Sequence, residues 1–88
     1  MRESKIEKAF RLRVKELGGL CEKFTSPARR SVPDRLVTLP GNRIIFVELK
    51  ATGKGPTKAQ ERDHKKRRKL GCDVRVINTM EAANAFPN

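Results

Sequence analysis

Two carboxylates and a lysine are spaced along this chain so that a β-hairpin brings them together. Asp34 ends a Val-Pro-Asp segment, and Glu48 and Lys50 stand two residues apart after a Pro-Gly-Asn turn. Residues two apart on a strand share a face of the sheet and are separated by about twice the ~3.3 Å strand rise. We expect Leu39 to pair with Ile44 across the turn. An antiparallel register then sets Asp34 opposite the Glu48 end of the next strand, so the three functional groups are predicted to converge.

Carboxylates this close repel each other unless a proton or a cation lies between them. Mg²⁺ and Mn²⁺ prefer oxygen ligands, so Asp34 and Glu48 are predicted to bind one of these ions, with the main-chain carbonyl of Leu49 as a further ligand. A bound ion lowers the pKa of a water molecule, and the Lys50 ammonium group orients that water or stabilises charge developing on a phosphodiester. The simpler alternative is a salt bridge between Glu48 and Lys50 at the edge of a sheet.

The charge balance of the chain indicates a polyanionic partner. The 88 residues include 21 Lys and Arg against 10 Asp and Glu, a formal net charge of +11 with a sequence pI near 10.5. Nucleic acid is the expected partner. A membrane surface is the competing polyanion, but we find no long apolar run, signal peptide or lipidation motif, and we expect a soluble, cytoplasmic protein. Hydrophobic residues at 36% allow only a modest core, so a homodimer is expected.

Most of the basic residues predicted to contact DNA lie in a loop before Asp34 and in a helix after Lys50. The segment 62–69 carries six basic residues, which predicts a surface that follows phosphates, although a solvated helical face is the alternative. His64 lies within this segment, and we expect a solvated or phosphate-contacting side chain. With four Phe and no Trp or Tyr, base stacking is not expected to dominate recognition. The predicted DNA-binding residues are Arg29, Arg30, Arg35, Lys54, Lys58, Lys65, Lys66, Arg67, Arg68 and Lys69.

The elements that must position these residues follow from hydrophobic periodicity and turn residues. A helix over 5–17 is indicated by Ile6, Phe10 and Val14 at helical spacing, and Gly18 and Gly19 end it. The order α-β-β-β-α-β-α predicts one α/β domain over residues 1–88, with a mixed sheet whose last strand is parallel to its neighbour. The other predicted elements are strands 20–24, 35–39 and 43–49, a helix 58–70, a strand 73–77 and a helix 81–86 capped by Thr79.

A series of short motifs covers nearly the whole chain in a characteristic order. They are Ile6-Glu7, Gly18-Gly19, Lys23-Phe24, residues 29–35, residues 46–50, Gln60 and residues 71–74. Together they resemble the virus-type replication-repair nuclease (VRR-NUC) domains of the PD-(D/E)XK nuclease superfamily. The resemblance implies a restriction-endonuclease-like fold and metal-dependent hydrolysis of branched or flapped DNA. One position departs from the pattern, because Ser31 stands where glycine is often found, and this departure touches none of the metal ligands.

The resemblance also implies roles for Glu7 and Gln60. In these nucleases a helical glutamate contributes to the metal site directly or through water. A glutamine after the E-x-K strand lies near the active site, which implies that Gln60 positions substrate or water. The alternative for each is a helix cap, because Ser4-x-x-Glu7 and Thr57-x-x-Gln60 both have the spacing of a capping box. We expect that one rotamer of Gln60 cannot fully serve both roles. Glu3, one turn before Glu7, is the substitute candidate for the metal site.

These observations predict a Mg²⁺- or Mn²⁺-dependent, structure-specific endodeoxyribonuclease in a prokaryotic cell or a phage-infected host. Its predicted catalytic residues are Asp34, Glu48, Lys50, Gln60 and Glu7. A two-fold dimer of so small a domain presents two active sites suited to a Holliday (four-way) junction, which is the leading substrate, whereas a monomer favours flap or single-strand cleavage. The competing class is a non-enzymatic basic nucleic-acid-binding protein, in which both carboxylates would repel the ligand. Restriction-type cleavage at a short sequence is a third reading, but the chain is small for a protein that carries a dedicated module for reading bases.

Overall fold

The computed structural model of the protein describes residues 2–88 and has the α/β order predicted from the sequence. Each boundary lies within two residues of its expected place, and Thr79 caps the last helix through a bond from the Ala82 N–H. None of the helices in residues 2–88 is long and apolar enough to cross a membrane. The elements are α1 (Glu3–Glu16), β1 (Leu20–Lys23), β2 (Arg35–Leu39), β3 (Arg43–Leu49), α2 (Lys58–Lys69), β4 (Asp73–Ile77) and α3 (Met80–Ala85).

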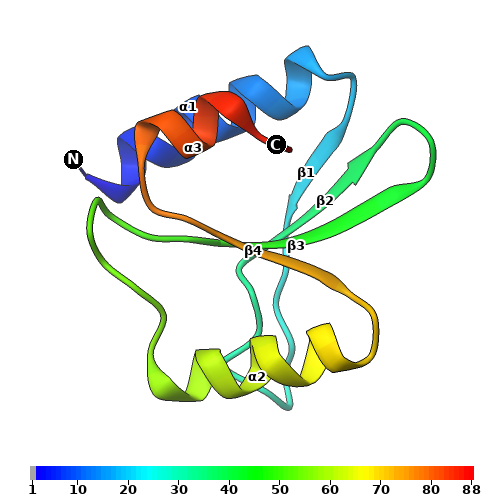
Figure 1. The fold of residues 1–88 in the computed structure, drawn as a ribbon, viewed down its shortest axis with the longest axis vertical. Coiled ribbons are helices and arrows are strands. Elements are labelled where there is room, and N and C mark those ends of the chain that lie inside the picture. Colours follow the sequence, from blue (N-terminus) through cyan, green and yellow to red (C-terminus); the bar gives the residue numbers. More distant parts are fainter. Residues whose placement is uncertain (1) are drawn as a thin grey trace.

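The four strands form one mixed sheet in the order β1-β2-β3-β4, with helices on both of its faces (Figure 1). β1, β2 and β3 pair antiparallel, whereas β4 pairs parallel to β3 after the crossover through α2. α1 and α3 cover one face of the sheet, and α2 lies against the other (Figure 1). The carboxyl end of β3 therefore opens into a connection that leads directly to α2.

The hydrophobic core lies between the sheet and the α1–α3 layer. Alternate residues of β2 and β3 point into it, as the period of two along a strand requires. Phe10 and Phe86 meet edge to face, with 4.8 Å between ring centroids. Gly19 allows α1 to pass close to the sheet, because a Cβ there would lie 2.6 Å from the Thr38 carbonyl oxygen. The main core residues are Ile6, Phe10, Val14, Val37, Leu39, Ile45, Val47, Leu49, Ile77, Ala83 and Phe86.

On the opposite face of the sheet, the helix α2 contributes polar rather than apolar side chains. α2 contains one apolar residue, Ala59, which is exposed, so the helix has no apolar stripe to bury. Its buried residues are Asp63 and His64. The guanidinium group of Arg67 lies over the rings of Phe24 and Phe46, 5.5 and 4.9 Å from their centroids. Ion pairs, hydrogen bonds and cation–π contacts therefore attach α2 to the sheet.

The β2–β3 hairpin closes one residue earlier than expected. Leu39 pairs with Arg43 rather than with Ile44, and Arg35 pairs with Val47. The reason is a three-residue turn in which Gly41 and Asn42 both have positive φ, 82° and 62°. Extended by one residue, this register sets Asp34 opposite Glu48.

Candidate active site

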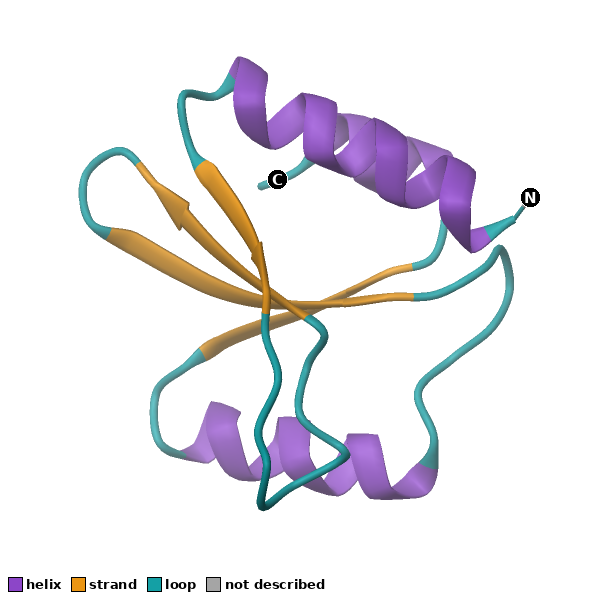
Figure 2. Cartoon of the chain, turned by 180° about the vertical axis from the view of Figure 1, so that it is seen from behind, coloured by secondary structure: helices purple, strands orange, loops and turns teal. Residues whose placement is uncertain are grey.

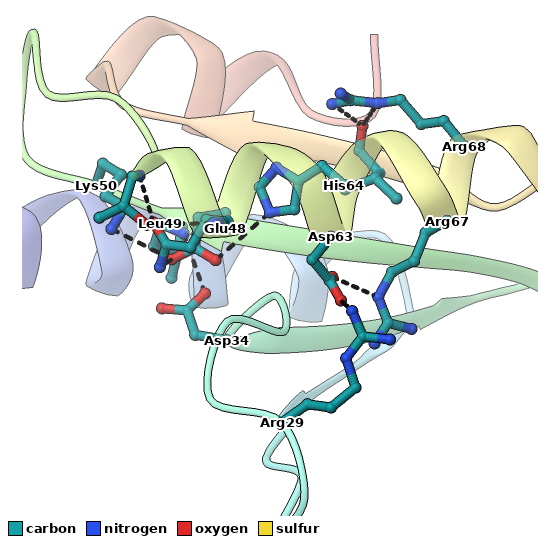
Figure 3. Close-up of polar contacts among 12 residues, drawn as sticks. Arg29, Asp34, Glu48, Leu49, Lys50, Asp63, His64, Arg67 and Arg68 are labelled. Carbon is teal, nitrogen blue, oxygen red and sulfur yellow. Dashed lines mark hydrogen bonds and ion pairs between the residues drawn. The ribbon is translucent and has the colours of Figure 1, made fainter.

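Asp34, Glu48 and Lys50 meet where β2 begins and β3 ends, on the side of the sheet that faces α2 (Figure 3). The Asp34 carboxylate accepts a hydrogen bond from the Leu49 N–H at 3.1 Å. The Lys50 ammonium nitrogen lies 3.6 Å from Glu48 Oε2, and the Glu48 side chain is only 4% exposed. The hairpin register and the period of two along β3 place these groups together. Glu48 and Lys50 do form the ion pair of the simpler reading, but they form it beside a second carboxylate.

The two carboxylates are electrostatically unfavourable as a pair of anions. Burial and, to a smaller extent, the charge of Asp34 raise the pKa of Glu48 to about 7, against the lowering effect of Lys50. Burial also raises the pKa of Asp34, against the hydrogen bond from Leu49 and the charge of Arg35. Each group therefore resists ionisation unless a positive charge arrives. A cation between them would relieve this cost.

The donor atoms suit a hard divalent cation. Asp34 and Glu48 offer carboxylate oxygens next to the main chain of Leu49, and Glu48 Oε1 is buried without a hydrogen-bond partner. Within residues 2–88, His, Cys, Asp and Glu side chains form no group of three or more that could hold a metal. Mg²⁺ commonly binds through one or two carboxylates while water and phosphate oxygens complete its shell. The site fits this mode of binding better than a closed cage of side chains.

The raised pKa of Glu48 predicts that this residue destabilises the metal-free protein at high pH. Its pKa is about 7 in the folded protein against an ordinary value of 4.5. Its favourable contribution to the free energy of unfolding is therefore complete below pH 4.5 and is lost as the pH rises through 7. A shift of this size corresponds to about 3 kcal/mol. In chelator-treated protein, we expect Glu48→Gln to raise the free energy of unfolding by roughly that amount at pH 8 and to change it little at pH 4.5.

Urea unfolding of both proteins at the two pH values measures this difference. The exposed Glu22→Gln variant controls for the loss of one negative charge from a basic protein. If Glu48→Gln raised the free energy of unfolding equally at pH 4.5 and pH 8, burial of the Glu48 charge would not be the source of the gain.

Gln60 caps α2 and holds Glu48 at the same time. Its amide oxygen accepts a hydrogen bond from the Thr57 N–H at 2.9 Å, and the Thr57 hydroxyl accepts one from the Gln60 N–H, which completes a capping box. Its amide nitrogen donates to Glu48 Oε2 at 3.3 Å. One rotamer therefore makes both contacts, because the amide oxygen and the amide nitrogen face different partners. Positioning of substrate or water by Gln60 stays a prediction.

Thr57 offers a matched control for the role of Gln60. Thr57→Ala removes one cap bond and leaves the hydrogen bond between Gln60 and Glu48. Gln60→Ala removes a cap bond and also the hydrogen bond to Glu48. We expect each change to cost roughly 0.5–2 kcal/mol of stability. Only Gln60→Ala should also weaken the binding of Mn²⁺, by about tenfold or more, as expected when a metal-binding carboxylate loses its hydrogen-bond partner. Thermal melting and calorimetric titration of both variants test this; equal metal affinities would leave Gln60 with a capping role alone.

Glu7 does not contact the two carboxylates. Its Oε1 lies 3.0 Å from Arg35 Nη2, and Arg35 Nη1 also donates to the Asp34 carbonyl, so Arg35 connects Glu7 to the site. The capping-box alternative for Glu7 was wrong, because α1 begins one residue before Ser4 and its N-cap, Arg2, makes no side-chain cap bond. Glu3 is the first-turn acid whose charge raises the pKa of both Asp34 and Glu48.

Asp63 was not recognised from the sequence, yet it joins the loop before Asp34 to α2 (Figure 3). It is 1% exposed, and its two oxygens lie 2.7 Å from Arg29 Nη2 and 2.7 Å from Arg67 Nε. The loop of residues 24–34 runs from the sheet down beside α2 (Figure 2). The signal available in the sequence was a single acid four residues before an arginine within a run of basic residues.

A pocket of about 310 Å³ opens between this loop and the site. Its lining includes Asp34, Glu48 and Gln60 together with the exposed arginines Arg29 and Arg30. Positive groups from the loop therefore border the same pocket as the carboxylates, where they can attract a phosphate.

The structure divides the basic residues predicted to contact DNA. Arg35 is 7% exposed and pairs with Glu7, so its predicted contact with a phosphate would require this ion pair to open. Arg67 is committed to Asp63 and the two Phe rings, and Arg68 donates twice to the Val74 carbonyl. Arg29 keeps 45% of its side chain exposed while it pairs with Asp63. The remaining predicted residues are exposed or partly so: Arg30, Lys54, Lys58, Lys65, Lys66 and Lys69.

His64 is not the solvated side chain expected from its basic surroundings. It is 1% exposed and points from α2 towards Glu48 (Figure 3). The sequence suggested a solvent-facing position because basic residues surround His64 on both sides. α2 instead turns this residue, with Gln60 one turn earlier, towards the sheet.

Comparisons with known proteins agree with this geometry. No model of a known protein family matches the chain. "Putative nuclease p44" of Acyrthosiphon pisum secondary endosymbiont phage 1 is 46% identical over 87 residues, which cover 99% of this chain and 94% of the relative. A solved structure described as a VRR_NUC domain superposes with a TM-score of 0.87 and 35% identity, covering 93% of this chain and 89% of that one. The chain therefore belongs to the VRR-NUC family of nucleases.

Proposed function

We propose that this nuclease is a Mg²⁺- or Mn²⁺-dependent DNA endonuclease and that it cleaves four-way junctions as a homodimer. The observation that carries the proposal is the convergence of Asp34, Glu48 and Lys50 beside an open pocket in a protein of net charge +11. The phage relative supports a role in the cytoplasm of a phage-infected prokaryotic cell, where such DNA intermediates occur.

In this proposal Asp34 and Glu48 hold the ion, with the Leu49 carbonyl and, directly or through water, an acid of α1 as further ligands. The family resemblance favours Glu7 as that acid, whereas the charge of Glu3 is the one that acts on both carboxylates. When bound, the ion supplies a water of lowered pKa and screens the phosphodiester. Lys50 keeps a positive charge beside Glu48, where it orients the attacking water or stabilises the charge of the transition state. The Gln60 amide donates to Glu48 Oε2 and so holds this carboxylate in place.

Recognition of DNA in this proposal depends on phosphate contacts rather than on bases. Phe10 and Phe86 are buried in the core, and Phe24 and Phe46 are partly buried with Arg67 over their rings, so the protein offers few aromatic faces for base stacking. The exposed lysines of α2 lie along its outer side. Such contacts select the shape of the backbone and tolerate changes of sequence.

The proposed dimer would form through α1 and β1. β1 is an edge strand of the sheet, and Leu12 and Leu20 beside it are 59% and 62% exposed. They line a groove of about 420 Å³ that Lys8 and Lys15 also border. An edge strand next to exposed apolar side chains is a surface suited to a second copy. Because like charges border this groove, added salt should strengthen the dimer while it weakens DNA binding.

Cleavage of a panel of labelled DNAs tests the proposal. We expect paired cuts on a four-way junction in Mg²⁺ or Mn²⁺, slower cleavage of flap, fork and linear duplexes, and no cleavage in chelator. Light scattering should give the mass of a dimer. A monomer that cleaves flaps or single strands as well as junctions would replace the junction proposal with the flap or single-strand alternative. Tight DNA binding without cleavage in either ion would favour the non-enzymatic reading.

A further inference from the structure

Two buried polar atoms face each other behind the candidate site and neither has a hydrogen-bond partner. They are Glu48 Oε1 and His64 Nε2, which lie 3.7 Å apart. The side chains are 4% and 1% exposed, so water does not replace a missing partner easily. An unsatisfied buried polar group costs about 1–3 kcal/mol, and two of them side by side need an explanation.

The two oxygens of Glu48 have different surroundings. Oε2 accepts a hydrogen bond from the Gln60 amide and lies 3.6 Å from the Lys50 ammonium nitrogen. Oε1 lies 3.7 Å from His64 Nε2 and accepts no hydrogen bond from residues 2–88. Gln60 and His64 are four residues apart on α2 and therefore share one face of the helix. α2 thus presents two potential donors, one to each oxygen of the same carboxylate.

The imidazole is suited to donate one hydrogen bond without carrying a charge. A neutral imidazole has one N–H donor and one acceptor nitrogen. A shortening of the 3.7 Å distance by about 0.7 Å gives an ordinary N–H···O bond.

We propose that His64 is a positioning residue, which donates its Nε2–H to Glu48 Oε1 when this carboxylate is ionised and bound to the catalytic cation. The inference rests on the proposed function, since it assigns Glu48 to the cation. His64 is neither a ligand nor a general base in this arrangement. It compensates the buried Oε1 and holds the carboxylate in one orientation, while Gln60 and Lys50 act on Oε2. Partners of this kind typically change metal affinity about 10- to 100-fold.

Two substitutions separate hydrogen bonding from packing. His64→Leu fills the space without a donor, and His64→Gln places an amide donor near the position of Nε2. We expect His64→Leu to weaken Mn²⁺ binding, measured by calorimetry without DNA, by about 10- to 100-fold. The Mn²⁺ concentration that gives half-maximal cleavage should rise by the same factor, while the rate at saturating Mn²⁺ stays within a few-fold of wild type. His64→Gln should recover most of the affinity.

Asp34→Asn and Glu48→Gln distinguish failure of this inference from failure of the metal site. If these variants bind Mn²⁺ as wild type does, the proposed function has failed. If they lose binding while His64→Leu binds Mn²⁺ normally, or if His64→Gln is as weak as His64→Leu, the positioning role alone is overturned.

A measurement on the unmodified protein covers the case in which His64→Leu does not fold. The ¹⁵N shifts of the single histidine report which ring nitrogen carries the proton. We expect a neutral ring protonated at Nε2 in the Mg²⁺-bound protein. Protonation at Nδ1 in that state would overturn the proposal, because Nε2 would then have no hydrogen to donate.

Discussion

Asp34→Asn, Glu48→Gln and Lys50→Ala are each expected to reduce DNA cleavage by at least about 10²-fold, the usual cost of removing one preorganised electrostatic group from an active site. The carboxylate variants lose a ligand of the proposed cation, and the lysine variant loses the charge 3.6 Å from Glu48. Single-turnover cleavage of a four-way junction at saturating Mg²⁺ measures the effect. In this proposal the three residues act on the cation and the transition state rather than on DNA binding. The loss should therefore appear in the cleavage rate rather than in the affinity for DNA.

Binding and folding provide the controls for these variants. In chelator, affinity for the junction should be unchanged or higher for the two carboxylate variants, because each removes a charge that repels phosphate. Glu81→Gln and Lys5→Ala change exposed charges on the opposite helical layer, outside the proposed dimer groove, and should cleave like wild type. Full activity in all three site variants would refute the assignment of this cluster as the active site.

DNA affinity is expected to fall roughly 10²- to 10³-fold between 50 and 200 mM salt, as for a protein that neutralises about five phosphates. The exposed lysines on the outer side of α2, Lys65, Lys66 and Lys69, supply much of this neutralisation. Replacing all three with Gln should reduce the slope of log affinity against log salt by about one for each phosphate that is no longer neutralised. The reduction should be the same for junctions of different sequence, because phosphates carry no sequence information.

A second triple variant separates direct contact from net charge. Lys8, Arg11 and Lys15 are exposed on α1, across the sheet from α2, and their replacement with Gln lowers the net charge equally. Fluorescence anisotropy at several salt concentrations compares the two variants, and sedimentation checks that both keep the wild-type oligomeric state. If both triple variants lower the slope equally, binding follows overall charge and α2 is not the DNA-binding surface.

The order of the elements and the convergence of Asp34, Glu48 and Lys50 could be predicted from local sequence patterns. Short-range features carry this information: the apolar period of α1, the two glycines at its end, and the alternation along β2 and β3 around a short turn. A hairpin brings together residues that are near in the chain, so Asp34 reaches Glu48 even though the register differs from expectation by one residue. Lys50 follows from the period of two along β3.

Which side chains of α2 face the sheet could be learned only from the packing of the folded protein. A helix without an apolar stripe gives no periodic signal for its inward face, so Asp63 and His64 could not be distinguished from the basic residues that surround them. The sequence also could not show that the amide oxygen of Gln60 faces Thr57 while its amide nitrogen faces Glu48. These contacts depend on how the helix is rotated against the sheet, which is set by ion pairs and cation–π contacts between segments far apart in the chain.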